Sequence, residues 1–136
     1  MESPTPPLGQ SCVRVIVVDD DHGIRTLLEL TMSLDDRFQL VGSAATAHEL
    51  HGLLEIHGPS SVDVVLLDVT LPDSDGIDLL ALLRERHPGL RLALFTGWSD
   101  EATQDRAHAA GADAIFPKDG NAQGLLDGIA ELASAR

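Results

Sequence analysis

Short apolar runs alternate along this chain with longer segments in which apolar residues recur every three to four positions. The run at 13–18 is an almost unbroken series of β-branched residues, which is typical of a parallel strand buried on both faces. Similar runs at 38–44, 62–67, 90–95 and 112–116 predict further strands. The segment after each run predicts a helix with one apolar face.

The expected helices carry boundary signals with a physical origin. Thr46 and Glu49 have the spacing of a capping box, in which two side chains satisfy free backbone N–H groups at a helix start. Ser99 and Asn121 are expected to cap the fourth and fifth helices, and Gly111 is a natural stop for the fourth. This series of strand–helix units predicts an α/β fold.

The alternation favours a doubly wound parallel sheet with helices on both faces. Right-handed crossovers leave few topologies, and the strand order 2-1-3-4-5 is a common one. Residues 1–12 are rich in Pro, Ser and Thr, so we expect a disordered N-terminal tail there. Residues 13–136 are then expected to form a single domain.

The charge balance narrows the choice of partners. The chain has 9 Lys and Arg against 22 Asp and Glu, a net charge of −13, so we expect no direct binding to nucleic acid. Its one cysteine, Cys12, cannot form an internal disulfide, which favours a reducing, cytoplasmic location. No signal peptide and no run long enough to span a bilayer is apparent, so no membrane association is expected.

Polar residues gather where the expected strands end. Because parallel strands end on the same edge of a sheet, these residues are expected to share one crevice. They come after the first, third, fourth and fifth strands, and they are Asp19, Asp20, Asp21, Asp68, Thr96 and Lys118.

Such a crevice has limited chemistry. Carboxylates a few ångström apart repel by about 1–4 kcal/mol per pair, and a divalent cation such as Mg²⁺ removes that repulsion. A carboxylate can also attack phosphorus to give an acyl phosphate. A cation, an ammonium group and a hydroxyl then supply the positioning and charge that phosphoryl transfer needs.

Four motifs at the strand ends resemble, in this order, the receiver domain of two-component response regulators. They are VIVVDDD (15–21), VDVVLLDVTLPDSDG (62–76), LALFTG (92–97) and GADAIFPK (111–118). The resemblance covers residues 13 to about 134. It implies a flavodoxin-like (βα)5 fold with a five-stranded parallel sheet in the order 2-1-3-4-5.

The resemblance also implies a role for each residue of the crevice. Asp68 would be the phosphoacceptor, and it would also contact Mg²⁺ (or Mn²⁺). Asp20 would bind the metal directly and Asp19 through water, and the backbone carbonyl of Thr70 would complete the protein ligands. On the phosphoryl group itself, Thr96 would bond an oxygen and Lys118 would pair with the charge.

A receiver of this kind would take its phosphoryl group from a sensor histidine kinase or a phosphotransfer protein. Its own chemistry would be self-phosphotransfer and slow autodephosphorylation, with no other enzymatic activity. Phosphorylation would switch the surface made by the fourth helix, fifth strand and fifth helix, which could also carry a homodimer. The sequence leaves open whether the chain acts alone or belongs to a longer regulator.

Two positions depart from the family pattern. The switch position in the fifth strand, usually aromatic, is Ile115, whose β-branched side chain has a stiff χ1. We therefore expect the loop after Thr96, with Trp98 as its bulky residue, to carry the signal instead. Lys118 is followed by Asp119 where the family often has a cis proline, so a trans peptide is expected.

Two other functions are compatible with parts of the pattern. A small phosphatase with an Asp nucleophile would need a second acid two residues after Asp68, where this chain has Thr70. A receiver-like binding module that has lost phosphorylation would not need the full set of acids, Thr and Lys that is present here. Treatment with a small acyl phosphate and Mg²⁺ separates the three functions by a lasting adduct, ester turnover or no reaction.

Several other polar residues have simpler interpretations. Asp21 is suited to cap the first helix. Asp73, Asp75 and Gly76 are expected to form turns rather than bind ligands. The pair His48 and His51 lies at helical spacing without a third ligand, so we interpret it as surface.

Overall fold

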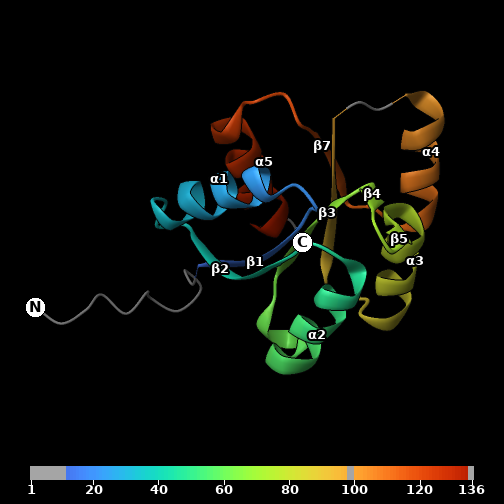
Figure 1. Cartoon of the computed structure of the whole chain (residues 1–136), viewed down its shortest axis with the longest axis horizontal. Coiled ribbons are helices and arrows are strands. Elements are labelled where there is room, and N and C mark those ends of the chain that lie inside the picture. Colours follow the sequence, from blue (N-terminus) through green and yellow to red (C-terminus); the bar gives the residue numbers. More distant parts are fainter. Residues whose placement is uncertain (1–11, 98–99, 135–136) are drawn as a thin grey trace, which may run out of the picture.

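The computed structural model describes residues 12–97 and 100–134, and in this part of the chain a central sheet lies between two layers of helices (Figure 1). The sheet strands are β1 (Val13–Val18), β2 (Phe38–Ala44), β3 (Val64–Asp68), β6 (Arg91–Thr96) and β7 (Ala114–Pro117). The helices are α1 (His22–Ser33), α2 (Ala47–His57), α3 (Gly76–Arg86), α4 (Glu101–Ala110) and α5 (Ala122–Ser134). A short 3₁₀ turn, η1 (Pro59–Ser61), precedes β3.

The sheet has the predicted topology. Its order is β2-β1-β3-β6-β7 and every neighbouring pair is parallel, which confirms the order 2-1-3-4-5 for the five expected strands. All strands of such a sheet end on one edge, and the register brings those ends level. Val18 pairs with Leu67, Asp68 with Phe95, and Thr96 with Pro117.

Each face of the sheet has its own hydrophobic core. Helices α1 and α5 cover one face, where Leu28, Met32, Leu126 and Ile129 pack on side chains such as Val17. Helices α2, α3 and α4 cover the other (Figure 1). That second core includes the buried residues Leu50, Leu54, Leu80, Leu83 and Ala107. Strands β1 and β3 are buried on both faces, which explains their nearly continuous apolar sequences.

Most of the predicted helix boundaries are confirmed. Thr46 accepts the backbone N–H of Glu49 (3.0 Å) at the start of α2, and Asn121 accepts that of Gly124 (2.9 Å) at the start of α5. Asp21 caps α1 through the N–H of Ile24, 3.1 Å away. Gly111 ends α4 with a φ of 105°, a left-handed conformation that glycine adopts without strain.

One predicted cap is wrong. The N-cap of α4 is Asp100, which accepts the N–H of Thr103 at 2.7 Å, and not Ser99. The helix begins one residue later than expected, and an aspartate at that point both accepts the N–H and complements the positive end of the helix. Ser99 and Trp98 lie outside the described residues, as does the expected tail except for Cys12.

The structure contains one element that the sequence pattern does not predict. Two-residue strands β4 (Thr70–Leu71) and β5 (Ser74–Asp75) pair antiparallel between β3 and α3. We call residues 70–75 the hairpin. Among the described residues no helix is long and apolar enough to cross a membrane, and none of their peptide bonds is cis, as expected for the bond between Lys118 and Asp119.

Candidate functional site

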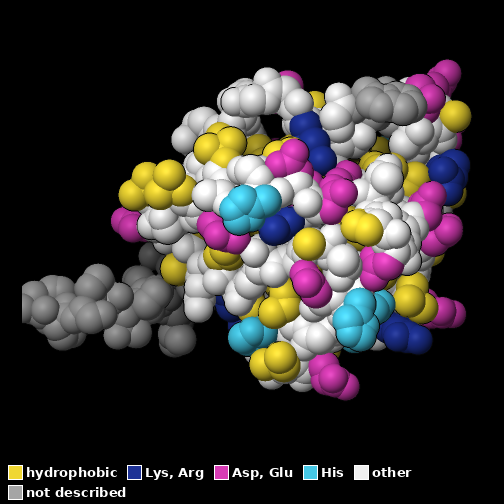
Figure 2. Space-filling view, in the orientation of Figure 1, with side chains coloured by type: hydrophobic (Ala, Val, Ile, Leu, Met, Phe, Trp, Pro, Cys, Tyr) yellow, Lys and Arg dark blue, Asp and Glu magenta, His cyan; other side chains and the backbone are white. Residues whose placement is uncertain are grey.

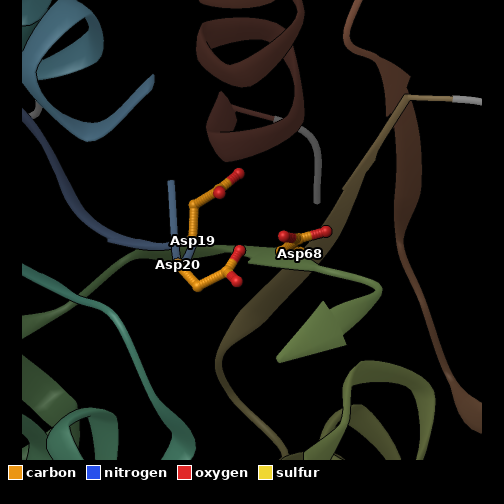
Figure 3. Close-up of side chains that lie close together, drawn as sticks. All are labelled: Asp19, Asp20 and Asp68. Carbon is orange, nitrogen blue, oxygen red and sulfur yellow. The ribbon is translucent and has the colours of Figure 1, made fainter. Parts of the chain in front are cut away.

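Three carboxylates meet at the edge where the strands end. Asp19 follows β1 and is fully buried, whereas its neighbour Asp20 is exposed. Asp68 is the last residue of β3, with 8% of its surface exposed. One oxygen from each lies within 4.8 Å of the others, and Figure 3 shows the three side chains side by side at the ends of β1 and β3. The structure therefore brings together the acids that the sequence places at different strand ends.

Lys118, the residue just after β7, also reaches this cluster. Its Nζ lies 2.7 Å from Oδ2 of Asp19 and 3.3 Å from Oδ2 of Asp68. The same ammonium lies 5.3 Å from the ring centroid of Phe95, close enough for a cation–π contact. Lys118 thus places one positive charge between two largely buried negative ones.

The charges in the cluster shift one another's protonation. Burial and the nearby charge of Asp19 raise the pKa of Asp68, although Lys118 and the Thr70 N–H partly oppose them. Burial alone would lower the pKa of Lys118, but Asp19 and Asp68 outweigh it and raise that pKa. Lys118 is therefore held in its charged form, whereas burial disfavours the charged form of Asp68 beside it.

Asp19 carries the clearest sign that the site suits a cation. Its Oδ1 accepts the backbone N–H of Asp21 at 2.9 Å. Its Oδ2 is buried and forms an ion pair with Nζ of Lys118 at 2.7 Å, and no second partner for this oxygen lies in the described part of the chain. An incompletely satisfied buried oxygen beside two further carboxylates is a donor set that hard divalent cations prefer. The residues present therefore fit Mg²⁺ or Mn²⁺.

Thr96 lies at the mouth of the cluster. It ends β6, it is buried, and its backbone oxygen accepts the N–H of Lys118 at 2.7 Å. This bond links the end of β6 to the residue that follows β7. An open pocket here is lined by Asp68, Val69, Thr70, Thr96, Gly97, Thr103 and Lys118. Asp68 of β3, Thr96 of β6 and Lys118 beyond β7 therefore line one space.

The chain after Asp68 turns back sharply. The backbone N–H of Thr70 donates to Oδ1 of Asp68 (3.3 Å), and that of Gly76 donates to the carbonyl of Val69 (2.6 Å). A Cβ atom at position 76 would lie 2.1 Å from the backbone oxygen of Asp68. Glycine is therefore required at this close approach, and the expectation that Gly76 serves the turn is confirmed.

Two acids of the hairpin do more than form a turn. Asp75 caps α3 by accepting the N–H groups of Ile77 (2.8 Å) and Asp78 (3.2 Å). Asp73 accepts N–H groups of α2, a contact that the sequence pattern did not predict. Helical periodicity relates residues three or four positions apart, whereas His48 and Asp73 are 25 positions apart. This contact is therefore apparent only in the folded structure.

Residues 15–130 match the family model of the response regulator receiver domain. The chain belongs to this family. Receiver domains generally bind Mg²⁺ at an acidic pocket and interact with histidine kinases or phosphotransfer proteins. The predicted family and fold are thereby confirmed.

Individual relatives agree with the family match. The chain is 34% identical over 125 residues to the DNA-binding transcriptional activator DevR/DosR of Mycobacterium tuberculosis, covering 91% of this chain and 56% of that protein. It is 26% identical to the chemotaxis protein CheY of Halobacterium salinarum, covering 90% of this chain and 98% of that one. The signal receiver domain of the response regulator NarL from Mycobacterium tuberculosis superposes with a TM-score of 0.84 at 27% identity, covering 93% and 99% of the two chains.

This receiver chain spans about half the length of several of its curated relatives, 52% and 56% in two cases. At the switch position of the family, Ile115 lies in β7, opposite Leu94 of β6. It is half-buried and packs on the core beneath α2, α3 and α4. A ring rotation at this position is impossible in this chain, because isoleucine has no ring.

Proposed function

We propose that this receiver accepts a phosphoryl group on Asp68 from a sensor histidine kinase or a phosphotransfer protein. The observation that carries the proposal is the place of Asp68, which opens on a pocket shared with Thr96 and lies 3.3 Å from Nζ of Lys118. In this proposal Asp19, Asp20, Asp68 and the backbone carbonyl of Thr70 hold Mg²⁺ (or Mn²⁺), with Asp19 acting through water. Residues 13–136 form the receiver domain.

The transfer itself uses the Asp68 carboxylate as nucleophile. An oxygen of Asp68 forms the new bond to phosphorus while the bond from phosphorus to the imidazole nitrogen of the donor histidine breaks, and the electron pair stays on that nitrogen. A bound divalent cation would supply positive charge against the phosphoryl oxygens. The Lys118 ammonium pairs with another phosphoryl oxygen, and the Thr96 hydroxyl donates to a third.

This chemistry changes the partners of Lys118. Before transfer its ammonium neutralises Asp19 and Asp68. After transfer Asp68 is an acyl phosphate, and the negative oxygens of the phosphoryl group replace its carboxylate as the partner of Lys118. Movement of Thr96 toward the same group would then alter the surface of α4, β7 and α5, which we propose for partner or output control and for a homodimer. The part of Trp98 in this step stays a prediction.

We propose that the chemistry of this chain is limited to self-phosphotransfer and slow autodephosphorylation. The acid that a phosphatase of the aspartate type would need two residues after its nucleophile is replaced by Thr70. A location in the cytoplasm, where kinases of this kind present their phosphohistidine, fits the proposal. The chain acts either alone or as the receiver of a longer regulator.

Acetyl phosphate tests the assignment of Asp68 without any kinase. Wild-type protein treated with acetyl phosphate and Mg²⁺ should gain the mass of one phosphoryl group, because a small acyl phosphate offers the same electrophile. Asp68→Asn keeps the shape of the side chain and removes the nucleophile, so it should gain none. Intact-mass spectrometry measures both. An equal adduct on Asp68→Asn would refute the assignment, and an adduct lost when Mg²⁺ is chelated is expected for wild type.

A further inference from the structure

Asp73 joins the hairpin to the start of α2. Its Oδ1 accepts the backbone N–H of Ala47 at 2.9 Å, and its Oδ2 accepts that of His48 at 3.1 Å. These are the first two residues of α2, 26 and 25 positions earlier in the chain. The third free N–H, of Glu49, is taken by Thr46. The Asp73 carboxylate thus accepts the two N–H groups at the start of α2 that the Thr46 cap leaves free.

Charge, as well as geometry, favours the contact between Asp73 and α2. The N-terminus of a helix carries a partial positive charge, so it prefers a carboxylate over a neutral acceptor. The two N–H groups of α2 hold the pKa of Asp73 below its ordinary value, with the Ala47 N–H as the larger cause. Asp73 is exposed to solvent, so its value lies in fixing two segments relative to one another rather than in a large contribution to stability.

The hairpin fixed in this way adjoins the proposed site. Thr70, its first residue, is the proposed source of the metal-binding carbonyl, and its N–H donates to the Asp68 carboxylate. At its base the hairpin is closed by the bond from the Gly76 N–H to the Val69 carbonyl. Near its tip, between the two short strands, it is held by Asp73. The backbone beside Asp68 is therefore held at two points: by a bond between the residues that flank the hairpin, and by the contact of Asp73 with the distant helix α2.

We propose that Asp73 is a positioning residue for the metal and phosphoryl site. By binding the start of α2, it holds the hairpin so that the carbonyl of Thr70 and the carboxylate of Asp68 face the same cation. This inference rests on the proposed function. Without this contact the metal ligands are still present, but their relative positions are less well fixed. Loss of an outer support of this kind commonly weakens metal binding by about tenfold or more.

Calorimetric titration with Mg²⁺ tests the proposal on four variants beside wild type. Asp73→Ala should weaken binding about tenfold. Asp73→Asn should lie between the two, because its amide oxygen can still accept one N–H. Thr46→Ala removes the local cap of the same helix, and Asp78→Asn removes a neighbouring exposed charge, so both should bind as wild type does. Thermal melts confirm that each variant is folded.

Hydrogen exchange supplies a readout that needs no metal. In metal-free protein, Asp73→Ala should speed amide exchange across residues 69–76, whereas Asp78→Asn should not. Unchanged exchange in Asp73→Ala would show that no tether exists.

The outcomes distinguish failure of the positioning role of Asp73 from failure of the proposed function. If wild type and Asp73→Ala bind Mg²⁺ equally, the inference is wrong and the proposed function stands. An equal loss in Thr46→Ala or Asp78→Asn also overturns the inference, because helix stability or charge would then explain the effect. If wild type binds no Mg²⁺, the proposed function fails and the inference fails with it.

Discussion

Asp19 and Asp20 are neighbours in sequence with opposite environments. Asp19 is buried, its Oδ1 accepts the Asp21 N–H and its Oδ2 forms an ion pair with Lys118. Asp20 is exposed, although its carboxylate belongs to the same cluster. A cation can reach Asp20 without displacing a hydrogen bond or ion pair to any residue in 12–97 or 100–134, whereas Asp19 would have to share its oxygen with Lys118. The difference suits Asp20 to direct metal binding and Asp19 to an indirect role.

We expect Asp20→Asn to separate the stability of the metal-free protein from its metal affinity. Removing this charge relieves repulsion among carboxylates, so the metal-free variant should melt at or above the wild-type temperature. The stabilisation by Mg²⁺ should shrink, and a tenfold weaker affinity would remove about 1.4 kcal/mol of it at saturating Mg²⁺. Thermal melts with and without Mg²⁺ measure both effects.

Asp36→Asn is the matched control, because Asp36 is exposed and precedes β2, at the opposite edge of the sheet from the site. It removes the same charge from the molecule and should leave the Mg²⁺ effect unchanged. Equal Mg²⁺ shifts in wild type and Asp20→Asn would show that Asp20 is not a ligand.

At the scale of elements, the bend between β3 and α3 depends on the missing side chain of Gly76. Gly76→Ala would place a Cβ 2.1 Å from the Asp68 carbonyl and 2.6 Å from that of Val69, so the backbone has to move. We expect a destabilisation of about 1–3 kcal/mol, as for other overpacked sites. Phosphorylation by acetyl phosphate should also slow, because Asp68 itself borders the clash. Denaturant unfolding and intact-mass time courses check the two effects.

Gly52→Ala provides the contrast within the same fold. Gly52 lies inside α2, and a Cβ there would meet nothing within 4 Å. Alanine should therefore stabilise the protein by about 0.5–1 kcal/mol through helix propensity, and phosphorylation should not change. Equal changes in the free energy of unfolding for Gly76→Ala and Gly52→Ala would show that the close backbone approach at Gly76 does not affect stability.

The same scale shows what the sequence can predict. The strands and the acids at their ends follow from apolar runs, because a buried parallel strand leaves a long, unmistakable pattern. The strand order follows from the right-handed crossovers together with the resemblance to receiver domains. The hairpin does not, since strands of two residues are too short to show any period. The contact of Asp73 with α2 cannot be predicted from periodicity either, because periodicity relates residues close in sequence and this contact joins distant segments. The cap of α4 differs by one residue because Ser99 and Asp100 are both good N-caps.

At the scale of the whole molecule, charge decides which partners the chain can bind directly. Figure 2 shows Asp and Glu side chains scattered over one face, with Lys and Arg too dispersed there to form a continuous patch. Several of the few cations are already paired, among them Arg14 with Asp63, Arg84 with Asp113, and Lys118 within the site. Binding to a phosphate backbone needs unpaired cations that can release its counterions. The distribution of charge therefore favours protein partners.

We accordingly expect no binding of this chain to DNA, whether or not it is phosphorylated. The net charge of −13 repels a polyanion, and a phosphoryl group on Asp68 makes the charge more negative still. Gel shifts at low salt, where electrostatic binding is strongest, are the most demanding measurement. A shift that weakens as salt is raised would contradict the expectation, because that dependence is the mark of phosphate contacts. If the chain is joined to an output domain in a longer regulator, DNA binding should appear only in the longer protein, while the isolated receiver stays inert under the same conditions.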